Sequence, residues 1–394
     1  MAFLSRLRIK PLLTHRHFSS ILSPDSAILT STQKTRTALS LLKTENNPEK
    51  ILDICRAAAL TPELSLDRAV FSFAISSLTK SQSFESIREY LEELKQRPDL
   101  QNERSLAHYM VLYGQAGMLD HAIRTFKEMG DLGISPTSMS LNSLLLASII
   151  AKKYDEVNRI FVEFTKTFGI MPDLDTYNML IKANIEAGSA NSTYSVLAEM
   201  ERKGIKPNAT TYGSMLAGFY GEEKFQDVEK VLESMEKHGM KPNLNIYNIR
   251  IQSLCKLKKT AEAKELFEKM VSYRKPNAVT YHHLIYGFGK EGNVDEVRSL
   301  YLDMRRKGYE PNASCYYTLV YYLSKGGDFE TALKACKESI SKKWYPNIAT
   351  MKMLIEGLVS TSKIEEAREL IGNLKGHFER NIDKWNEIEE SLPK

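Results

Sequence analysis

Cysteine is scarce in this sequence of 394 residues, and its four thiols lie far apart, at Cys55, Cys255, Cys315 and Cys336. No two of them form a C-x-x-C pair. This spacing argues against a disulfide framework or a cysteine zinc site and is typical of a protein from a reducing compartment. Long apolar runs are also missing, and none approaches the length of about 18 residues that a membrane-spanning helix needs.

Motifs of the common catalytic classes are absent. The sequence has no Gly-rich phosphate loop, no G-x-S-x-G turn, and no H-x-E followed by the P-C-x-x-C of base deaminases. The eight histidines show no metal-ligand spacing beyond the adjacent His282 and His283, which we interpret as a surface pair. We therefore expect no enzyme activity, no cofactor, no metal and no small-molecule substrate.

Acidic residues are missing from the N-terminal segment, where the first one is Asp25. Residues 1–20 also contain several serines and an apolar side, a combination typical of an organellar transit peptide. We expect this segment to direct the protein to the mitochondrial matrix and to be cut just after Phe18. Plastid import and a plain basic tail stay open as alternatives. The basic residues of the segment are Arg6, Arg8, Lys10 and Arg16.

An excess of positive charge is missing as well. The full chain carries 54 Lys+Arg against 49 Asp+Glu, a formal net charge of +5. Removal of residues 1–18 takes away four of these positive charges and leaves a net charge of +1. A protein that held nucleic acid by bulk charge would be far more basic. An anionic partner must therefore be held by local placement of charge.

Proline is infrequent, with 13 residues, but most of its positions are regularly spaced. Seven prolines follow one another at intervals of 34 to 36 residues, and tyrosines and methionines keep the same interval. A fixed period of this kind indicates a repeat protein. The three series are Pro136, Pro172, Pro207, Pro242, Pro276, Pro311 and Pro346; Tyr177, Tyr212, Tyr247, Tyr281 and Tyr316; and Met200, Met235, Met270 and Met304.

Each repeat is predicted to be a pair of helices. In residues 209–243, an apolar run at 212–220 precedes an amphipathic segment whose apolar residues recur with the helical period. Gly239 follows that segment, where a left-handed cap would end the helix. Because one helical pair cannot bury its apolar face alone, such pairs stack. We predict an all-α fold, a right-handed α-solenoid of about nine 35-residue helix-turn-helix repeats.

The predicted organisation has four parts. Residues 1–20 are the transit peptide, and 21–67 are an N-terminal extension with a degenerate helical pair at 33–67. The repeat array covers 68–381. Residues 382–394, which include Trp385 among acidic residues, form a C-terminal capping segment.

The repeat resembles a known family. Its form, x-x-T-Y-N-x-L-I followed by A-x-x-L-F-x-x-M and G-x-x-P-[ND], resembles the pentatricopeptide repeat, and residues 174–208 and 278–312 match it closely. The resemblance covers about four-fifths of the chain. The tetratricopeptide repeat differs, since it has a period of 34 and a Trp/Leu-Gly signature that this sequence lacks. The uniform repeat length is similar to that of the pure-repeat P subclass of plant organelles.

The resemblance implies that each repeat can address one RNA base through two side chains, the residue after the helix-one aromatic and the residue after the proline. Three repeats carry pairs of the expected type, and the first would favour uracil and the others a pyrimidine. Asn or Asp at the second position is also explained by helix capping alone. The three pairs are Asn142 with Asp173, Asn178 with Asn208, and Asn248 with Asn277.

Two residues before the aromatic, base-reading members of the family carry an apolar side chain that sandwiches the base. Here only Met139 and Val279 suit that role, because the equivalent residues of the other repeats are polar or small. The lack of an apolar side chain at this position in most repeats is expected to weaken RNA binding, since base stacking contributes about 1–3 kcal/mol per base. The other residues of the series are Asp175, Thr210, Asn245, Ser314 and Ala349.

Basic residues are candidates for phosphate contacts. Four lysines share the place at the end of helix one that often faces phosphate in this family, and further basic residues cluster between residues 250 and 345. Solvated surface lysines would show the same pattern. The candidates are Lys80, Lys256, Lys290 and Lys325 at the helix ends, and Lys258, Lys259, Arg305 and Arg306 in the clusters.

Three functions follow as hypotheses. The first is a non-catalytic RNA-binding protein in mitochondrial gene expression, with RNA processing, stability or translation as its role. The second is a structural component of the mitochondrial ribosome, in its small subunit, that contacts rRNA and ribosomal proteins. The third is a peptide-binding scaffold. We expect RNA as the partner, either mRNA or rRNA, and no membrane.

Overall fold

The computed structural model describes residues 31–60, 67–375, 382–390 and 392. In these ranges the chain forms α-helices and one short 3₁₀ helix, without a β-strand. The predicted all-α class is therefore confirmed. The expected transit peptide at 1–20 lies outside the described residues, as do residues 61–66 of the predicted N-terminal pair and 376–381 at the end of the predicted array.

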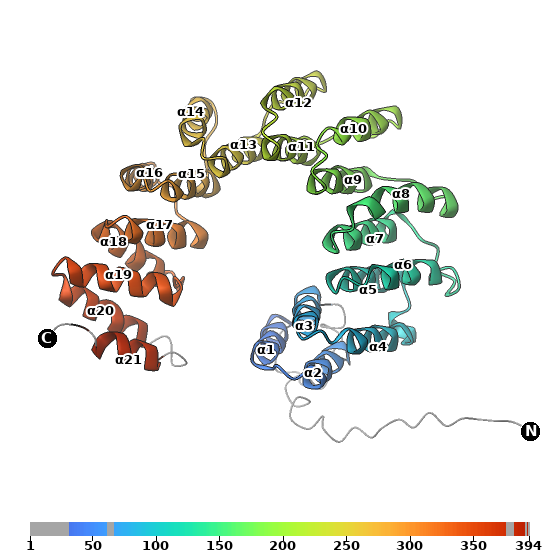
Figure 1. Ribbon diagram of the computed structural model, residues 1–394, viewed down its shortest axis with the longest axis horizontal. Helices are drawn as coiled ribbons and strands as arrows, with labels where there is room; N and C mark the ends of the chain where they lie inside the picture. The colour runs from blue at the N-terminus through green and yellow to red at the C-terminus, as the bar shows by residue number, and fades with distance from the viewer. Residues whose placement is uncertain (1–30, 61–66, 376–381, 391, 393–394) are drawn as a thin grey trace, which may run out of the picture. The chain divides into compact units, whose positions relative to one another are not determined.

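Residues 68–375 form nine successive helical pairs (Figure 1). The first helices are α3 (Arg68–Lys80), α5 (Glu103–Gln115), α7 (Ser138–Ile150), α9 (Leu174–Glu186), α11 (Ala209–Gly221), α13 (Leu244–Lys256), α15 (Ala278–Lys290), α17 (Ala313–Lys325) and α19 (Ile348–Ser360). The second helices are α4 (Phe84–Lys95), α6 (Leu119–Glu128), α8 (Tyr154–Phe168), α10 (Ser192–Arg202), α12 (Phe225–Lys237), α14 (Thr260–Val271), α16 (Val294–Arg306), α18 (Phe329–Ser341) and α20 (Ile364–Lys375). Before the nine pairs lie α1 (Ser31–Thr44) and α2 (Pro48–Leu60), after them α21 (Ile382–Glu390), and between α4 and α5 the 3₁₀ helix η1 (Pro98–Leu100).

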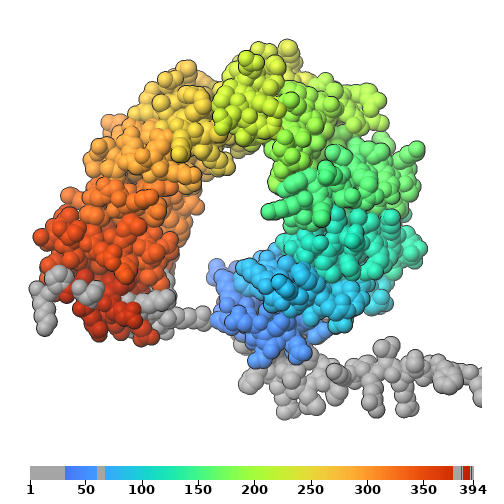
Figure 2. Space-filling view, in the orientation of Figure 1, coloured from blue at the N-terminus to red at the C-terminus, as the bar shows by residue number. Residues whose placement is uncertain are grey.

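The chain divides into two compact units, Met1–Pro207 and Asn208–Lys394. In the first unit, α3, α5, α7 and α9 contact one another in sequence order, and in the second unit α11, α13, α15, α17 and α19 do the same. Each second helix packs against the first helix of its own pair. Each unit therefore has two layers, a row of first helices and a row of second helices, as Figure 1 shows for α12, α14 and α16 beside α11, α13 and α15. Within a unit the surface is continuous from pair to pair (Figure 2).

The periodic tyrosines and methionines form the core between the two layers. Tyr177, Tyr212, Tyr281 and Tyr316 are fully buried, and the periodic methionines are buried against them. The tyrosine hydroxyls reach partners 22 residues later, on the second helix: the Tyr281 hydroxyl donates to Asp303 at 2.9 Å. Burying an aromatic ring while its hydroxyl keeps a partner satisfies both parts of the side chain. These four tyrosines thus join the two helices of their pairs, whereas the Tyr247 hydroxyl contacts that of Tyr273, just after α14.

The residue after each periodic proline caps the following helix. Asn277, for example, has an extended backbone, and its side chain accepts a hydrogen bond from the backbone N–H of Thr280 at 3.0 Å. In return, the Thr280 hydroxyl oxygen accepts a hydrogen bond from the Asn277 backbone N–H. Such a capping box satisfies two donors that helix geometry leaves unpaired. At the other end, Gly204, Gly239 and Gly308 adopt positive φ just after the second helix, as predicted.

None of the helices that the structure describes has the length and apolar character needed to cross a membrane.

Candidate nucleic-acid interface

Each first helix from α7 to α19 presents one exposed stripe, which runs along one side of the helix for 11 residues. The stripe begins two residues before the core aromatic position. All seven residues at this place are exposed: Met139, Asp175, Thr210, Asn245, Val279, Ser314 and Ala349. Met139 is 46% exposed and Val279 is 38% exposed, so two large apolar side chains face solvent here. We call this surface the first-helix stripe.

In α13, α15 and α17 the stripe ends in a lysine. Lys256, Lys290 and Lys325 each lie 11 residues after the first member of their stripe, close to three full turns of 3.6 residues, and therefore on the same side of the helix. All three are exposed. Since α13 contacts α15 and α15 contacts α17, the three lysines are arranged at the same end of adjacent helices. Lys80 has the same place at the end of α3 in the first unit.

These lysines keep their charge free. Among the ion pairs within 4.0 Å that the described part of the chain contains, none includes Lys80, Lys256, Lys290 or Lys325, and none includes Lys258. Lys290 Nζ lies 5.8 Å from the ring centroid of Tyr286, and Lys325 Nζ lies 5.9 Å from that of Tyr321. Both ammonium groups thus rest beside aromatic rings, which attract cations without neutralising them.

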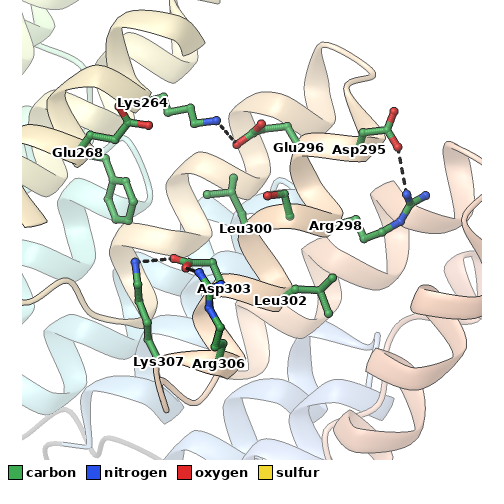
Figure 3. Close-up of a pocket in the computed structure, with 12 residues that line it drawn as sticks. Lys264, Glu268, Asp295, Glu296, Arg298, Leu300, Leu302, Asp303, Arg306 and Lys307 are labelled. Carbon is green, nitrogen blue, oxygen red and sulfur yellow. Dashed lines mark hydrogen bonds and ion pairs between the residues drawn. The ribbon is translucent and has the colours of Figure 1, made fainter.

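The basic residues at the end of α16 are held in ion pairs. Arg306 and Lys307 both pair with Asp303, at 2.7 and 2.8 Å, as Figure 3 shows. Arg305 pairs with Glu310 at 2.6 Å. Burial opposes ionisation of Asp303, yet hydrogen bonds from Lys307, Arg306 and Tyr281 hold its pKa below the ordinary value. Arg305 and Arg306 are therefore weak phosphate candidates.

Lys259 resembles Arg305 and Arg306 in being ion-paired, because it pairs with Glu262 at 2.7 Å. It is therefore also a weak phosphate candidate.

A cavity of about 600 Å³ lies between α14 and α16, in the second-helix layer (Figure 3). Its walls are lined by cations and carboxylates that already pair with each other, such as Lys264 with Glu296 at 2.8 Å and Arg298 with Asp295 at 3.1 Å. Such a lining offers little free charge to a ligand. In the described ranges, no group of three or more His, Cys, Asp and Glu side chains is arranged to hold a metal ion.

Asn142 and Asp173 lie together in the first unit. The Asn142 amide donates to Asp173 Oδ1 at 3.1 Å, and the same carboxylate caps α9 by accepting from the Thr176 backbone at 2.9 Å. Burial opposes ionisation of Asp173, but hydrogen bonds from Ser138, Thr176 and Asn142 hold its pKa below the ordinary value. The pair is half-buried beside the exposed Met139, and the Asn142 Oδ1 atom itself is buried.

Asn248 and Asn277 also lie together, in the second unit, but their amides are more fully occupied. Asn248 Nδ2 is 3.5 Å from Asn277 Oδ1, and Asn248 Oδ1 accepts from the Thr280 hydroxyl at 2.7 Å. Asn248 is only 7% exposed. Its amide is therefore engaged in the protein's own hydrogen bonds.

The third pair is divided between the units. Asn178 lies half-buried on α9 in the first unit. Asn208 belongs to the second unit, where its side chain caps α11 by accepting from Thr210 and Thr211 at 2.9 and 3.0 Å. All three residues that follow a proline in the predicted pairs, Asp173, Asn208 and Asn277, thus act as helix caps.

Sequence reasoning missed a group of exposed aromatic residues on α15 and α17. Tyr286 and Tyr317 are 36% and 38% exposed, and Tyr321 and Tyr322 are half-buried. The missed signal was a fourth periodic series: Tyr286 and Tyr321 are 35 residues apart, and each stands four residues before a stripe lysine.

The geometry defines a helical-repeat protein with a free cationic edge on its first-helix layer, and comparison with known proteins identifies the family. Models of the pentatricopeptide repeat match residues 110–134, 124–186, 175–205, 195–257, 246–274 and 276–325. A mitochondrial pentatricopeptide repeat-containing protein of Arabidopsis thaliana is 46% identical, covering 100% of this chain and 99% of its relative. The chain belongs to the pentatricopeptide repeat family.

Other relatives include two Arabidopsis thaliana proteins named as small ribosomal subunit proteins. One, mL103, is 28% identical over 90% of this chain and 87% of its own length, and the other, mS78, is 32% identical over 48% of each. Among solved structures, the pentatricopeptide repeat protein PPR10 from maize matches with 17% identity and a TM-score of 0.44, covering 90% of this chain and 62% of the maize chain.

Proposed function

We propose that this chain binds single-stranded RNA in the mitochondrion and serves gene expression there without catalysing a reaction. The observation that carries the proposal is the set of Lys256, Lys290 and Lys325, which are exposed at the same end of adjacent first helices and form no carboxylate ion pair within residues 31–60, 67–375 and 382–390. A phosphate backbone is the anion that presents charges at regular intervals, and its neutralisation supplies most of the affinity of such proteins. The mitochondrial relative at 46% identity supports the location.

Base recognition is proposed for the Asn/Asp pairs, above all for Asn142 and Asp173. Asn142 Oδ1 lacks a hydrogen-bond partner within the described part of the chain. This oxygen is buried, so a base N–H, such as that of uracil, would satisfy it once rotation of the Asn142 side chain exposes it, and Met139 would contact the base face. Asn178 with Asn208 and Asn248 with Asn277 are proposed as weaker pyrimidine readers, with Val279 beside the latter. Asn178→Thr should then shift preference toward a purine, as oligonucleotide competition would show.

The test of RNA binding compares two triple variants of equal charge. Lys256, Lys290 and Lys325 are replaced by Ala in one, and the ion-paired Arg306, Lys307 and Lys342 in the other. Binding of a U-rich strand is followed by fluorescence anisotropy. The strand has about 14 nucleotides, a length within the range of single-strand sites. We expect a loss of about tenfold or more for the first triple and less than about threefold for the second, since paired cations have little free charge to offer. Equal losses would contradict the proposal.

A structural role in the mitochondrial small ribosomal subunit is the second candidate. Two observations favour it: the relatives that carry ribosomal names, and the internal hydrogen bonds of Asn248, which reduce the number of available base readers. In this role Lys80, Lys256, Lys258, Lys290 and Lys325 would contact rRNA. The tagged protein should then sediment with the small subunit from lysed mitochondria and follow it when EDTA separates the subunits. Sedimentation in light fractions alone would exclude this role.

A further inference from the structure

Three tyrosines on α15 and α17 form a continuous aromatic group. Tyr286 and Tyr322 have ring centroids 6.1 Å apart at an interplanar angle of 77°, and Tyr322 and Tyr321 have centroids 4.9 Å apart at 75°. Edge-to-face contacts of this kind are the arrangement that aromatic pairs favour. Because Tyr286 comes from one repeat and Tyr321 and Tyr322 from the next, the group bridges two repeats. We call it the α15–α17 tyrosine cluster.

A glycine fixes the position of the central ring. The ring of Tyr322 lies against the backbone of α15 at Gly289, where an added Cβ would overlap the Tyr322 Cγ and Cδ2 atoms. Only a residue without Cβ allows this approach. The cluster is thus held by backbone packing, and it keeps one ring, that of Tyr286, 36% exposed at the surface.

Cations flank the cluster at one side. Lys290 Nζ lies 5.8 Å from the Tyr286 centroid, and Lys325 Nζ lies 5.9 Å from the Tyr321 centroid. A cavity of about 260 Å³ at the ends of α15 and α17 is lined by both lysines and by Tyr322. One carboxylate also lines it, that of Glu291, which accepts a hydrogen bond from the Thr260 hydroxyl at 2.6 Å. The two ammonium groups therefore face this cavity without a carboxylate ion pair among the described residues.

We propose that the α15–α17 tyrosine cluster stacks unpaired bases of an RNA strand irrespective of base identity, while Lys290 and Lys325 hold the adjoining phosphates. The inference rests on the proposed RNA-binding function and adds a second kind of contact to it. Every base has a π-face, so stacking on tyrosine tolerates any sequence, whereas the Asn/Asp pairs select. Duplex RNA is a poor ligand for such a site because its bases are already stacked. The free cations favour a polyanion over a protein segment.

The test uses the full chain and two homopolymers, oligo(U) and oligo(A), of about 14 nucleotides each. The double variant Tyr286→Leu/Tyr321→Leu removes the two outer rings of the cluster but keeps apolar volume, and Tyr286→Phe/Tyr321→Phe keeps all three rings. We expect the Leu variant to bind both homopolymers about tenfold more weakly, because stacking on one or two aromatic rings is lost. The Phe variant should bind within about twofold of wild type, since the π-faces remain.

A spectroscopic readout separates stacking from a structural role. A strand with 2-aminopurine should lose fluorescence on binding the wild-type and Phe proteins, and keep it with the Leu protein. The single variant Tyr286→Leu, at the most exposed ring of the cluster, repeats the test if the double variant unfolds below the assay temperature.

Unchanged affinity of the Leu variants for both homopolymers would overturn the inference while leaving the proposed function intact. A loss for one homopolymer only would also overturn it, because it would show selection. If the wild-type protein binds neither homopolymer nor U-rich RNA, the proposed function itself fails. If the Leu variant keeps its RNA affinity but no longer sediments with ribosomes, the cluster is a protein contact and the inference is wrong.

Discussion

The first-helix stripes of the two units differ although the repeats share one backbone plan. In the first unit, the stripe of α7 runs from Met139 to the 38% exposed Ile150, both apolar. On α9 the stripe carries Lys182 and Glu186, which approach each other within 4.0 Å. In the second unit, the stripes of α13, α15 and α17 each end in a lysine that has no ion pair in the part of the chain that the structure describes. The same helix pair is thus used with an apolar stripe on α7 and an acidic one on α9, and with cationic stripes on α13, α15 and α17.

The difference teaches that affinity and selectivity can reside in different repeats. Asn142, Asp173 and Met139, the set proposed above to recognise a base, lie in the first unit. Lys256, Lys290, Lys325 and the α15–α17 tyrosine cluster lie in the second unit, and Lys80, which also forms no ion pair among the described residues, ends α3 in the first. Phosphate and stacking contacts position a strand without reading it, while amide and carboxylate edges read it. Variants in each unit should therefore change different observables.

The largest effect on stability is expected at the closest approach of two helices in the first unit. A Cβ on Gly114 of α5 would lie 2.5 Å from Ala147 Cα of α7, a backbone atom that cannot move aside alone. We expect Gly114→Ala to lower the free energy of unfolding by about 2–3 kcal/mol, the upper range for overpacking. Thermal and urea unfolding of the variant and the wild type measure this change in the free energy of unfolding.

The matched control is Gly372→Ala in α20 of the second unit, where an added Cβ meets nothing within 4 Å. That variant should gain about 0.5–1 kcal/mol from helix propensity. Equal effects of the two substitutions would show that α5 and α7 are not packed as described.

Acid should destabilise the first unit through His108. Burial lowers the pKa of this imidazole to about 4, with the nearby Arg68 adding to the effect. An unfolded histidine has a pKa near 6.5, so the unfolded state binds the proton first as the pH falls. Stability should therefore be full above about pH 6.5 and decline toward pH 4, at up to about 1.4 kcal/mol per pH unit.

His108→Leu should reduce this pH slope, as urea unfolding at pH 7 and pH 5 would measure. An unchanged slope would show that the imidazole is not buried.

His283 in the second unit also has a pKa lowered by burial to about 4, so the stripe of α15 carries the charge of Lys290 and not that of an imidazolium near pH 7.

A smaller effect is expected from Asp173→Ala. The substitution removes both the cap of α9 and the contact with Asn142, and should cost about 1–2 kcal/mol. Asn312→Ala in the second unit is the matched control, since Asn312 caps α17 by accepting from Cys315 at 2.9 Å. Its cost should be about 1 kcal/mol.

Only Asp173→Ala should weaken the preference for a uracil-containing strand, which competition between oligonucleotides would measure. An equal change in preference for the Asn312 variant would refute the assignment of selectivity to the first unit.

Much of the fold was predictable because the same residue types recur at the same positions of each repeat. The proline period placed the caps, the tyrosine and methionine periods placed the core, and the glycines at positive φ ended the second helices. The division after Pro207 was not predicted, since no break in the period marks it. Contacts between helices of different repeats decide that division, and a single repeat does not encode them.

The site was predictable in residue type but not in charge state. From the sequence, Arg306 and Lys290 are equivalent basic residues. In the structure Arg306 pairs with Asp303, whereas Lys290 has no ion pair with any described residue. Which cation finds a carboxylate depends on side chains from the neighbouring turn or repeat. The occupied amide of Asn248 is a similar case, because its partner Thr280 belongs to the next helix pair.

The most direct test of the central claim is the salt dependence of RNA binding. The dissociation constant of a U-rich strand is measured against salt concentration for the wild-type protein and for the triple Ala variant at Lys256, Lys290 and Lys325. Because each neutralised phosphate of a single strand contributes about 0.7 to the slope of log K against log salt, the account predicts a slope smaller by about 2 in the variant. Identical slopes would contradict it, since they would show that these lysines neutralise no phosphate.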